Sequence, residues 1–379
     1  MNLDMLREKI DTVDNEIVRL MTERMDIASQ IAAFKKENDL PVLNAGRERE
    51  KLADITGKSR EDLQDYMQVL YNLIFELSRS HQNRLLLPTT ETANEVQKAI
   101  ETTPKLFPKT ARVVCQGVEG AYSTLAAERL FATPSILHVN TFEGAFSAIE
   151  SGLCEYGILP IENSTAGSVN QVYDLMISRN FHIVRSVRIK VDHSLLVKPG
   201  VKKEQIREVF SHEQAIRQCE GYLKALGVKV TTCENTAVAA KMVAESDRTD
   251  IAALSSLRCA ELYGLTPLDK CVQDKANNHT RFICISKKME IYPGADKTSL
   301  MMILSHRPGS LYKVLAKFYA LGINLIKLES RPMPDRDFEF MFYFDLETSI
   351  YSDAFVRIIC ELGEICEEFK YLGSYSEVI

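Results

Sequence analysis

The sequence of 379 residues lacks the patterns that mark several large classes of protein. No apolar run approaches the length needed to cross a bilayer, and residues 1–16 alternate charged and apolar positions where a secretory signal has an apolar core. The nine cysteines contain no CxxC pair and the seven histidines no HExxH motif, which argues against a disulfide framework and a zinc site. We expect a cytoplasmic protein that uses no metal.

The charge balance argues against two classes of binding partner. Lysine and arginine number 46 against 52 aspartates and glutamates, a formal net charge of −6, so neither nucleic acid nor an anionic membrane is expected to bind. Hydrophobic residues make up 45% and charged residues 26%, as in soluble globular proteins. A chain of this length exceeds a single ordinary core, so roughly two to four domains are expected.

Four stretches of different pattern follow one another. Residues 1–87 are poor in glycine and proline and helical in period, whereas residues 88–108 hold three prolines and are expected to be a linker with about one helical turn. In residues 109–290, short apolar strands alternate with helical patterns, which is typical of an α/β domain. Residues 297–379 follow the order strand, helix, strand, strand, helix, strand, which predicts a small α+β domain of the βαββαβ kind.

One arginine interrupts the apolar seam of the first helix. Apolar residues recur at alternating spacings of three and four from Leu3 to Leu20 and resume at Ile27, but Arg24 occupies the seam between them. A snorkelling arginine at a solvated end is the simple alternative. An unpaired guanidinium among apolar neighbours would cost several kcal/mol, however, so an anionic ligand is the better explanation. Lys35, three turns further on, projects from nearly the same face.

Arg7 lies on the same helix, about 25 Å from Arg24, which is too far for both to hold one small ligand. Two antiparallel copies of the helix would bring Arg7 of one chain near Lys35 of the other. A dimer with shared sites follows if all three act together.

Short motifs in this helical region resemble the all-helical chorismate mutases that form an intertwined dimer. They are LREKID at residues 6–11, ER at 23–24, AAFK at 32–35, GREREK at 46–51 and SRSHQ at 78–82. From spacing alone, Ser78 and Gln82 share one face of a third helix, and each taken singly is an ordinary surface residue.

The resemblance implies a Claisen rearrangement of chorismate, which is intramolecular and needs a charged cavity but no nucleophile. The residues that it places in that cavity are Arg7 of a second chain and Arg24, Lys35, Arg47, Glu48, Ser78 and Gln82 of the first. The arginines at 7 and 24 would hold carboxylates, Lys35 and Gln82 would donate to the ether oxygen, and Glu48 would take the ring hydroxyl. Asn44 stands where relatives often have aspartate, which is a mild change if that position works through its backbone.

Several strands of the central region run directly into small polar residues that begin a helix. These junctions lie near residues 115–123, 161–168, 210–212, 233–236 and 254–256. Each offers free backbone N–H groups at the positive end of a helix dipole, although ordinary N-capping explains any single one. Such junctions gather at the carboxyl ends of strands, so several together favour a small, multiply charged anion. Gly117 and Gly120 lack the GxGxxG spacing, so no dinucleotide site is expected.

This central region resembles prephenate dehydratases over about residues 111–288. The matching motifs are GVEGAYS at 117–123, LPIENS at 159–164, DHSLL at 192–196, SHEQA at 211–215, LYGL at 262–265 and HTRF at 279–282. The resemblance implies two α/β lobes around a cleft, similar to periplasmic ligand-binding proteins. It implies a dicarboxylate that loses carbon dioxide and a ring hydroxyl, with Thr280 as the donor of the proton that the hydroxyl needs.

The resemblance assigns further residues to prephenate. They are Asn163, Ser164, Thr165 and Ser211 for the carboxylates, and Glu162, Gln218 and Glu234 for the shape of the site. Arg281 is also assigned to the substrate, with a structural ion pair as the alternative. His212 and His279 are interpreted as supporting residues.

Two C-terminal motifs, PGSL at 308–311 and INLIKLESRP at 323–332, resemble the ACT domains fused to prephenate dehydratases. In that family the motifs bind phenylalanine at a dimer interface, which implies feedback inhibition. The residues concerned are Gly309, Ser310, Leu311, Asn324, Glu329, Ser330, Arg331 and Pro332. An ACT fold kept only for dimerisation is the alternative.

The resulting prediction is a homodimer or higher homo-oligomer that turns chorismate into prephenate and prephenate into phenylpyruvate without a metal or an organic cofactor. One rival is a sensor that only captures an aromatic acid, which would have no use for a proton donor at Thr280. The other is a mutase fused to an NAD-dependent dehydrogenase, whose nucleotide fingerprint is missing.

Overall fold

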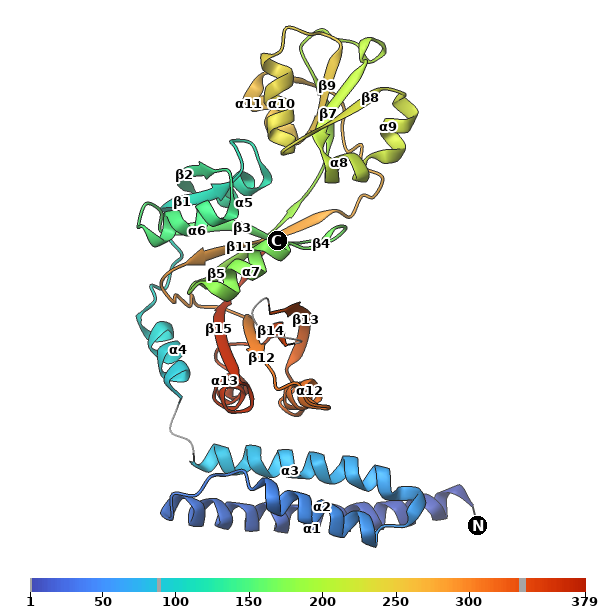
Figure 1. Cartoon of the computed structure of the whole chain (residues 1–379), viewed down its shortest axis with the longest axis vertical. Helices are drawn as coiled ribbons and strands as arrows, with labels where there is room; N and C mark the ends of the chain where they lie inside the picture. The colour runs from blue at the N-terminus through green and yellow to red at the C-terminus, as the bar shows by residue number, and fades with distance from the viewer. Residues whose placement is uncertain (1, 87–89, 334–338) are drawn as a thin grey trace.

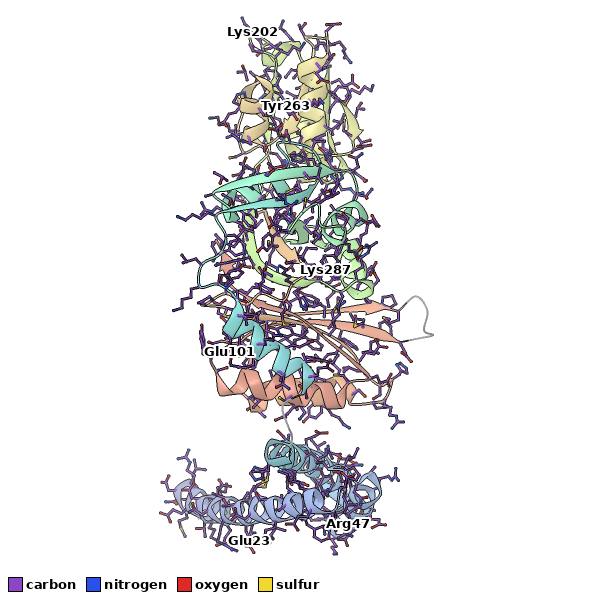
Figure 2. The ribbon with its side chains drawn as sticks, turned by 90° about the vertical axis from the view of Figure 1, so that its left-hand side faces the viewer. Glu23, Arg47, Glu101, Lys202, Tyr263 and Lys287 are labelled. Carbon is purple, nitrogen blue, oxygen red and sulfur yellow. The ribbon has the colours of Figure 1, made fainter. Side chains whose placement is uncertain are left out.

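The computed structural model describes residues 2–86, 90–333 and 339–379 (Figure 1). Along the longest axis, a bundle of helices lies at one end, followed by the C-terminal sheet and then by two α/β lobes. A view from the side shows the same stacking, with Glu23 and Arg47 in the bundle and Lys202 and Tyr263 in the far lobe (Figure 2). Within the described residues, no helix has both the length and the apolar character needed to cross a bilayer.

The bundle consists of α1 (Leu3–Glu37), α2 (Ala45–Lys58) and α3 (Gln64–Leu86), with a short 3-10 helix at Glu61–Leu63. The side chains of Asn2 and Asn44 cap the first two helices, and α1 packs along α3. Only Ala28 and Ala32 are buried on α1, while seam residues such as Ile17 are 57% exposed. The single chain therefore leaves most of the predicted seam uncovered.

Helix α4 (Glu91–Thr102) corrects the expectation that residues 88–108 hold about one helical turn. Thr90 caps it by accepting from the backbone N–H of Ala93. Ala93, Val96 and Ala99 are buried in one core with the C-terminal domain. Figure 2 shows Glu101 of this helix beside the C-terminal layer. The segment is therefore a packed element of the fold.

The first lobe is built on a sheet of order β16-β5-β11-β3-β1-β2, with β4 paired to β3. Its elements are β1 (Thr110–Gln116), α5 (Tyr122–Leu130), β2 (Thr133–Val139), α6 (Phe142–Glu150), β3 (Tyr156–Asn163), β4 (Gly167–Ser168), α7 (Asn170–Ser178), β5 (His182–Lys190), β11 (His279–Ser286) and β16 (Glu377–Val378). β11 runs antiparallel between β3 and β5, so a strand from late in the chain lies at the centre of this lobe.

The second lobe has a sheet of order β10-β6-β9-β7-β8. Its elements are β6 (Ser194–Val197), β7 (Glu208–His212), α8 (Glu213–Gln218), α9 (Glu220–Leu226), β8 (Lys229–Cys233), α10 (Thr236–Glu245), β9 (Ile251–Ser255), α11 (Leu257–Tyr263) and β10 (Thr266–Asp269), with a 3-10 turn at Lys203–Gln205. The chain enters this lobe after β5 and leaves it before β11, so two crossings join the lobes. The predicted two-lobed α/β architecture is confirmed.

The C-terminal domain consists of β12 (Lys297–Ile303), α12 (Ser310–Ala320), β13 (Asn324–Pro332), β14 (Phe340–Glu347), α13 (Asp353–Ile365) and β15 (Glu368–Tyr375). This is the predicted βαββαβ order, in an antiparallel sheet β13-β14-β12-β15. One side of the sheet shares a core with α12, α13 and α4. Residues of the other side, including Met301 and Tyr343, share a core with Ile283 of the first lobe.

Candidate functional site

Two cations of α1 meet polar side chains of α3 in the helical bundle. The Arg24 guanidinium donates a hydrogen bond to the Ser78 hydroxyl. The Lys35 ammonium donates to the side-chain oxygen of Gln82 at 3.4 Å and to the carbonyl of Val42. Ser78 and Gln82 are buried although they lie more than 40 residues along the chain from their partners. The fold thus gathers four residues that were predicted to share a cavity.

Glu48 is the acidic member of this cluster. Burial lowers the pKa of Arg24 and that of Lys35, and Glu48 acts against both shifts. The Glu48 carboxylate accepts from Arg79, which also pairs with Glu76 at 2.5 Å. Sequence analysis missed Arg79, whose signal is the one-turn spacing from Glu76. Three cations against two carboxylates leave this cluster positive, which suits an anionic ligand.

Three further residues assigned to this cavity lie outside the cluster within one chain. Arg7 is 65% exposed and pairs with Asp4 at 3.5 Å, and Arg47 is 72% exposed and pairs with Glu50 at 3.7 Å. The side chain of Asn44 caps α2 by accepting from the backbone N–H of Arg47 at 3.0 Å. Asparagine and aspartate cap helices about equally well, so Asn44 is a mild change at this position.

A polar cavity of about 430 Å³ lies between the two α/β lobes. The first lobe contributes the β1–α5 junction and the ends of β3 and β11, and the second contributes the β7–α8 and β8–α10 junctions. None of the lining residues is a lysine or an arginine, and Glu234 is the one carboxylate among them. Binding of an anion here therefore depends on hydroxyls, amides and the N-termini of α5 and α10.

Thr280 and Asn163 lie side by side in this cavity. The Asn163 amide nitrogen donates to the Thr280 hydroxyl at 2.9 Å. The orientation of that amide is determined, because its oxygen accepts from the backbone N–H groups of Thr165 at 3.0 Å and Ala166 at 2.9 Å. Because the Thr280 oxygen accepts this hydrogen bond, its hydroxyl proton is available to be donated to a ligand.

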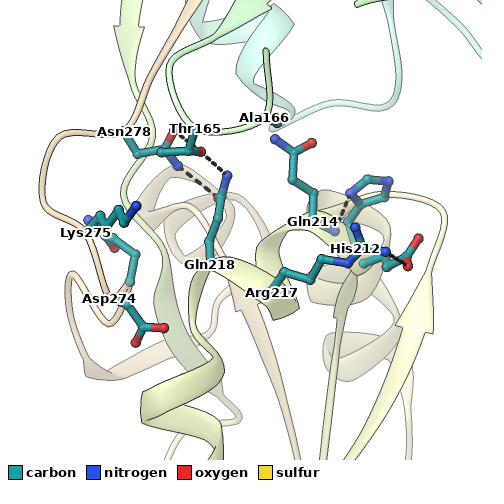
Figure 3. Close-up of a pocket in the computed structure, with 11 residues that line it drawn as sticks. Thr165, Ala166, His212, Gln214, Arg217, Gln218, Asp274, Lys275 and Asn278 are labelled. Carbon is teal, nitrogen blue, oxygen red and sulfur yellow. Dashed lines mark hydrogen bonds and ion pairs between the residues drawn. The ribbon is translucent and has the colours of Figure 1, made fainter. Parts of the chain in front are cut away.

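Gln218 links the two lobes across this cavity (Figure 3). Its amide nitrogen donates to the Thr165 hydroxyl at 2.8 Å, and its oxygen accepts from the Asn278 amide at 2.9 Å. The same oxygen lies 2.9 Å from the His193 ring nitrogen. Burial lowers the pKa of His193 and that of His212, so both imidazoles favour the neutral form. Neither of these histidines adds a lasting positive charge.

A larger outer pocket of about 650 Å³ adjoins the cavity and shares His212, Gln214 and Gln218 with it. Figure 3 shows Arg217 and Lys275 on its walls. Two carboxylates line the same pocket, Asp274 and Glu213, and Glu213 pairs with Arg217 at 2.5 Å, so these side chains give the outer pocket no excess of positive charge. Asn278, His193 and Gln214 were missed by sequence analysis, although Asn278 directly precedes HTRF and His193 lies in DHSLL.

Five residues assigned to prephenate do not line the inner cavity, and one of them, Thr165, lines only the outer pocket. Ser211 is fully buried and donates to the Leu254 carbonyl at 2.7 Å. Ser164 donates to the Asn277 carbonyl at 3.0 Å. The other two, Glu162 and Arg281, face the C-terminal sheet in place of the cleft. For Arg281 this is the structural ion pair that was the alternative.

The residues assigned to phenylalanine fall into two groups. Gly309 precedes α12 with φ at +86°, the Ser310 hydroxyl lies 3.0 Å from that of Ser305, and Leu311 packs against the domain core. On β13, Glu329 accepts from Ser168 at 2.7 Å and Arg331 pairs with Asp174 at 2.9 Å, so both contact the first lobe.

The remaining three lie along β13. Ser330 and Pro332 are exposed, and Asn324 donates to Glu347 at 2.9 Å. Throughout the described ranges, no group of three or more histidine, cysteine, aspartate and glutamate side chains is placed to hold a metal ion.

The chain is similar to known proteins in both regions. The family described as prephenate dehydratase matches residues 113–290, and the family described as chorismate mutase type II matches residues 6–83. The bifunctional chorismate mutase/prephenate dehydratase of Escherichia coli strain K12 is 31% identical, over 98% of this chain and 95% of its own length.

Two solved structures are each similar to about two thirds of the chain or slightly more. A prephenate dehydratase from Arthrobacter aurescens in complex with L-Phe has a TM-score of 0.65 at 25% identity and covers 70% of this chain and 89% of its own. A protein described as a novel type of quorum-quenching acylase, GqqA, has a TM-score of 0.64 at 32% identity and covers 69% of this chain and 97% of its own.

Proposed function

The chain belongs to the family of bifunctional chorismate mutase/prephenate dehydratases, and we propose that it converts chorismate into prephenate and prephenate into phenylpyruvate. The observation that carries the proposal is the chemistry of two groups of side chains. The bundle holds a positively charged cluster without an obvious nucleophile, and the inner cavity of the cleft holds a directed hydroxyl and is lined by no lysine or arginine.

The mutase pocket suits a reaction in which no proton or electron pair leaves the substrate. Chorismate breaks its ether C–O bond and forms a C–C bond in one cyclic step, so the protein needs to hold a compact conformer and stabilise charge on the ether oxygen. Lys35 and Gln82 are the donors for that oxygen, Arg24 binds a carboxylate, and Glu48, held by Arg79, takes the ring hydroxyl.

We propose a dimer in which Arg7 of a second chain completes this pocket. Arg7 and Lys35 lie 28 residues apart on one straight helix, roughly 40 Å, so one chain does not bring them together. The exposed seam supports the proposal, since Ile10, Val13 and Ile17 are each more than half exposed. A second α1 packed antiparallel on this seam would bury them.

In the cleft, Thr280 is the proposed acid. The ring C–O bond breaks as Thr280 passes its proton to the departing hydroxyl, which leaves as water. The C–COO bond breaks at the same time, and its electron pair completes the aromatic ring as carbon dioxide departs. A threonine is a weak acid, so aromatisation provides most of the driving force. Asn163 directs the hydroxyl, and the helix N-termini receive the carboxylates.

We propose that the C-terminal domain is an ACT domain through which phenylalanine inhibits the dehydratase. Support comes from the βαββαβ order, from the two sequence motifs and from the L-Phe complex of the A. aurescens relative. Among the assigned ligand residues, Glu329 and Arg331 already contact the first lobe, whereas those at the start of α12, from Gly309 to Leu311, lie within the C-terminal domain. Dimerisation without a ligand is the alternative for this domain.

The cleft argues against an acylase, the activity in the description of GqqA. Amide hydrolysis by a hydroxyl nucleophile needs an adjacent base. Thr280 accepts from Asn163, and the Ser123 hydroxyl donates to the Gln116 carbonyl at 2.8 Å. Neither hydroxyl has a histidine partner among the hydrogen bonds of the described residues, so an activated nucleophile is not formed by these two.

The test is to incubate the purified protein with chorismate alone and to identify the products by mass spectrometry, with and without phenylalanine. Phenylpyruvate that decreases with phenylalanine is the expected result. Prephenate that accumulates would leave the cleft as a binding domain, and unchanged chorismate with folded protein would refute the mutase.

A further inference from the structure

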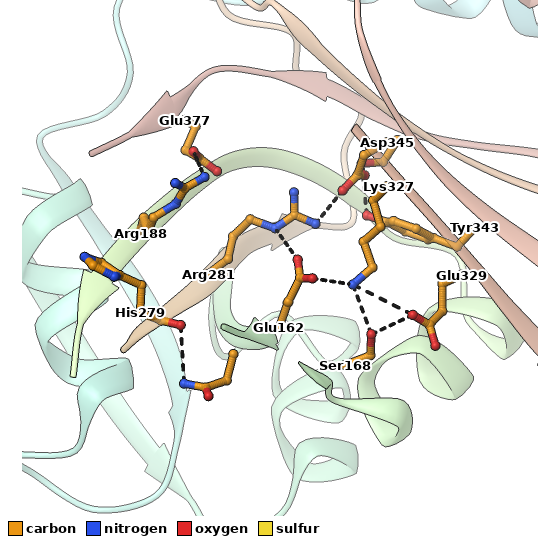
Figure 4. A network of polar contacts seen from close by, with 12 residues as sticks. Glu162, Ser168, Arg188, His279, Arg281, Lys327, Glu329, Tyr343, Asp345 and Glu377 are labelled. Atoms are coloured by element: carbon orange, nitrogen blue, oxygen red, sulfur yellow. Dashed lines mark hydrogen bonds and ion pairs between the residues drawn. The ribbon is translucent and has the colours of Figure 1, made fainter. Parts of the chain in front are cut away.

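Strand alternation directs the residues of the active-site strands toward two different partners. In the antiparallel pair β3 and β11, Thr280 lies opposite Asn163, and Arg281 lies opposite Glu162. Thr280 and Asn163 line the cleft cavity, whereas Arg281 and Glu162 face the C-terminal sheet (Figure 4). Consecutive side chains in a strand point to opposite faces, so any displacement of Arg281 also moves the backbone that carries Thr280.

Two residues of the C-terminal sheet hold this opposite face. Asp345 of β14 pairs with Arg281, and Lys327 of β13 pairs with Glu162 at 2.9 Å. Arg281 and Glu162 lie 3.7 Å apart and so connect the two pairs. The side chains of Arg281 and Lys327 are 8% and 10% exposed, and that of Asp345 is fully buried. Water therefore screens the Arg281–Asp345 pair only weakly, whereas the Glu162 side chain is 38% exposed and its pair with Lys327 is screened more.

A buried hydroxyl cluster holds Asp345 in one orientation. Ser299 donates to one of its carboxylate oxygens at 2.5 Å and lies within hydrogen-bond distance of the Tyr343 and Tyr375 hydroxyls, at 3.0 and 2.7 Å. Burial alone would lower the pKa of Arg281, but Asp345 holds that pKa above its ordinary value. The guanidinium beside the active site thus has its buried counter-ion in another domain.

Cohesion between the two domains does not depend on these charges. An apolar core already joins the sheets, with Ile283 of β11 in one cluster with Met301 and Leu372. Buried ion pairs add little net stability compared with apolar packing, but they demand a defined geometry. These two pairs lie on the strands that carry Thr280 and Asn163, directly beside them, and therefore point to control of position.

We infer that Asp345 and Lys327 are positioning residues of the dehydratase, which hold β11 and β3 so that Thr280 and Asn163 meet the substrate. The inference rests on the proposed dehydratase function. It makes the C-terminal sheet a working part of that active site, because the buried counter-ion of Arg281 and the cation nearest to Glu162 both lie in that sheet.

The same contacts reach the strand that carries the second phenylalanine motif. Lys327 donates to Ser168 at 3.0 Å, and Ser168 donates to Glu329 at 2.7 Å (Figure 4). Lys327 and Glu329 both lie within residues 323–332. A ligand that displaces β13 would therefore act directly on Glu162, which is adjacent to Asn163.

The test compares Asp345→Asn and Lys327→Met with the parent full-length chain, using prephenate for the dehydratase and chorismate for the mutase. We expect the dehydratase kcat to fall roughly 10- to 100-fold in Asp345→Asn and about 3- to 10-fold in Lys327→Met, with KM changed less than about threefold. The mutase rate should stay at the parental value, which shows that the bundle is folded, and the circular dichroism spectrum should match that of the parent, which shows that the rest of the chain is.

The control is Asp174→Asn, which breaks the Asp174–Arg331 pair between α7 and β13 without touching β3 or β11. Its dehydratase kcat should stay within about twofold of the parent. An unchanged kcat in Asp345→Asn, or an equal loss in Asp174→Asn, would overturn the inference. If Asp345→Asn does not fold, an unchanged dehydratase kcat in Lys327→Met would overturn the inference in its place. A parent without dehydratase turnover refutes the proposed function itself, and the inference with it.

Discussion

At the scale of single residues, Thr280 works only through its neighbours. Its hydroxyl accepts from Asn163, whose amide is oriented in turn by the backbone N–H groups of Thr165 and Ala166. The next residue, Arg281, faces away and anchors the strand to Asp345. The HTRF motif thus carries both the proposed acid, Thr280, and the residue that anchors its strand, Arg281. The two side chains point to opposite faces of the sheet because side chains alternate along a β-strand.

Replacing Thr280 by valine keeps the volume of the side chain but removes its proton. We expect the dehydratase kcat to fall by roughly 10²-fold or more, because a positioned acid contributes about that much. Thr280→Ser retains the hydroxyl and should keep most of the rate, and the mutase rate should be unaffected in both. A Thr280→Val enzyme with the full dehydratase rate would exclude this residue as the acid.

Arg24 has a matched control on its own helix. Arg24→Gln should lower the mutase kcat/KM by roughly 10²- to 10³-fold, because a half-buried cation that faces the substrate dianion is lost. Arg19 is 59% exposed and pairs with Glu16 and Glu23 on the surface, so Arg19→Gln should change the rate less than about twofold. Steady-state assays with chorismate compare the two, and similar rates would rule out Arg24 as a ligand residue.

His182 should make stability depend on pH. Burial, and then the charge of Lys370, lowers its pKa to about 4, so the folded protein keeps it neutral while the unfolded chain takes a proton near pH 6.5. Stability is therefore lost as the pH falls from about 6.5 toward 4, by about 2 kcal/mol between pH 7 and pH 5. Urea unfolding of His182→Gln should show a smaller loss than the parent, and parallel losses would contradict the assignment.

At the scale of elements, the sequence predicts what depends on local period. The long first helix and the order of strands and helices in the C-terminal domain follow from apolar spacing alone. The length of α4 was underestimated because the segment lies between prolines and threonines, and two of its three buried positions, Ala93 and Ala99, are small residues. β16 has only two residues. Its pairing with β5 depends on where the fold places these residues, which a local pattern does not predict.

The same distinction between local patterns and long-range contacts applies to the site residues. Motifs predict Arg24, Lys35, Asn163 and Thr280, because their residue types suit the chemistry. The partner of Arg281 is not predicted, since 64 residues separate it from Asp345 and nothing local relates them. Spacing within a motif shows that consecutive strand residues point to opposite faces of the sheet. It does not show which face borders the cleft, because that depends on where the neighbouring domain packs.

α4 provides a prediction at this scale. Val96 is 3% exposed in a core shared with the C-terminal domain, so Val96→Ala should lower the free energy of unfolding by about 2 kcal/mol through lost burial and a small cavity. Glu95 is exposed on the same helix, and Glu95→Ala should change it by less than about 0.5 kcal/mol. Thermal or urea unfolding measures both. Equal stabilities would mean that α4 is only a tether.

At the scale of the whole molecule, the C-terminal domain lies between the two proposed active sites. Its sheet packs on the first lobe through an apolar core and the Asp345 and Lys327 pairs. Its helices face the bundle, where the Ser80 hydroxyl donates to both carboxylate oxygens of Glu361 at 2.8 Å and Lys317 pairs with Glu361 at 2.7 Å. A ligand-induced change in this domain would therefore be felt by both neighbours.

The shared mutase site makes a quantitative prediction about mixed chains. Arg7→Ala and Lys35→Ala should each abolish most mutase activity, because every pocket of either homodimer lacks one cation. In a mixed dimer, one pocket combines the intact Lys35 of the first variant with the intact Arg7 of the second, and the other pocket lacks both. Random exchange makes half of the dimers mixed, so an equimolar mixture should recover about a quarter of the parental mutase rate. Mass spectrometry of intact dimers verifies the exchange. A mixture that has exchanged and stays inactive would show that each pocket is built from one chain, and the exposed seam of α1 would then need another partner.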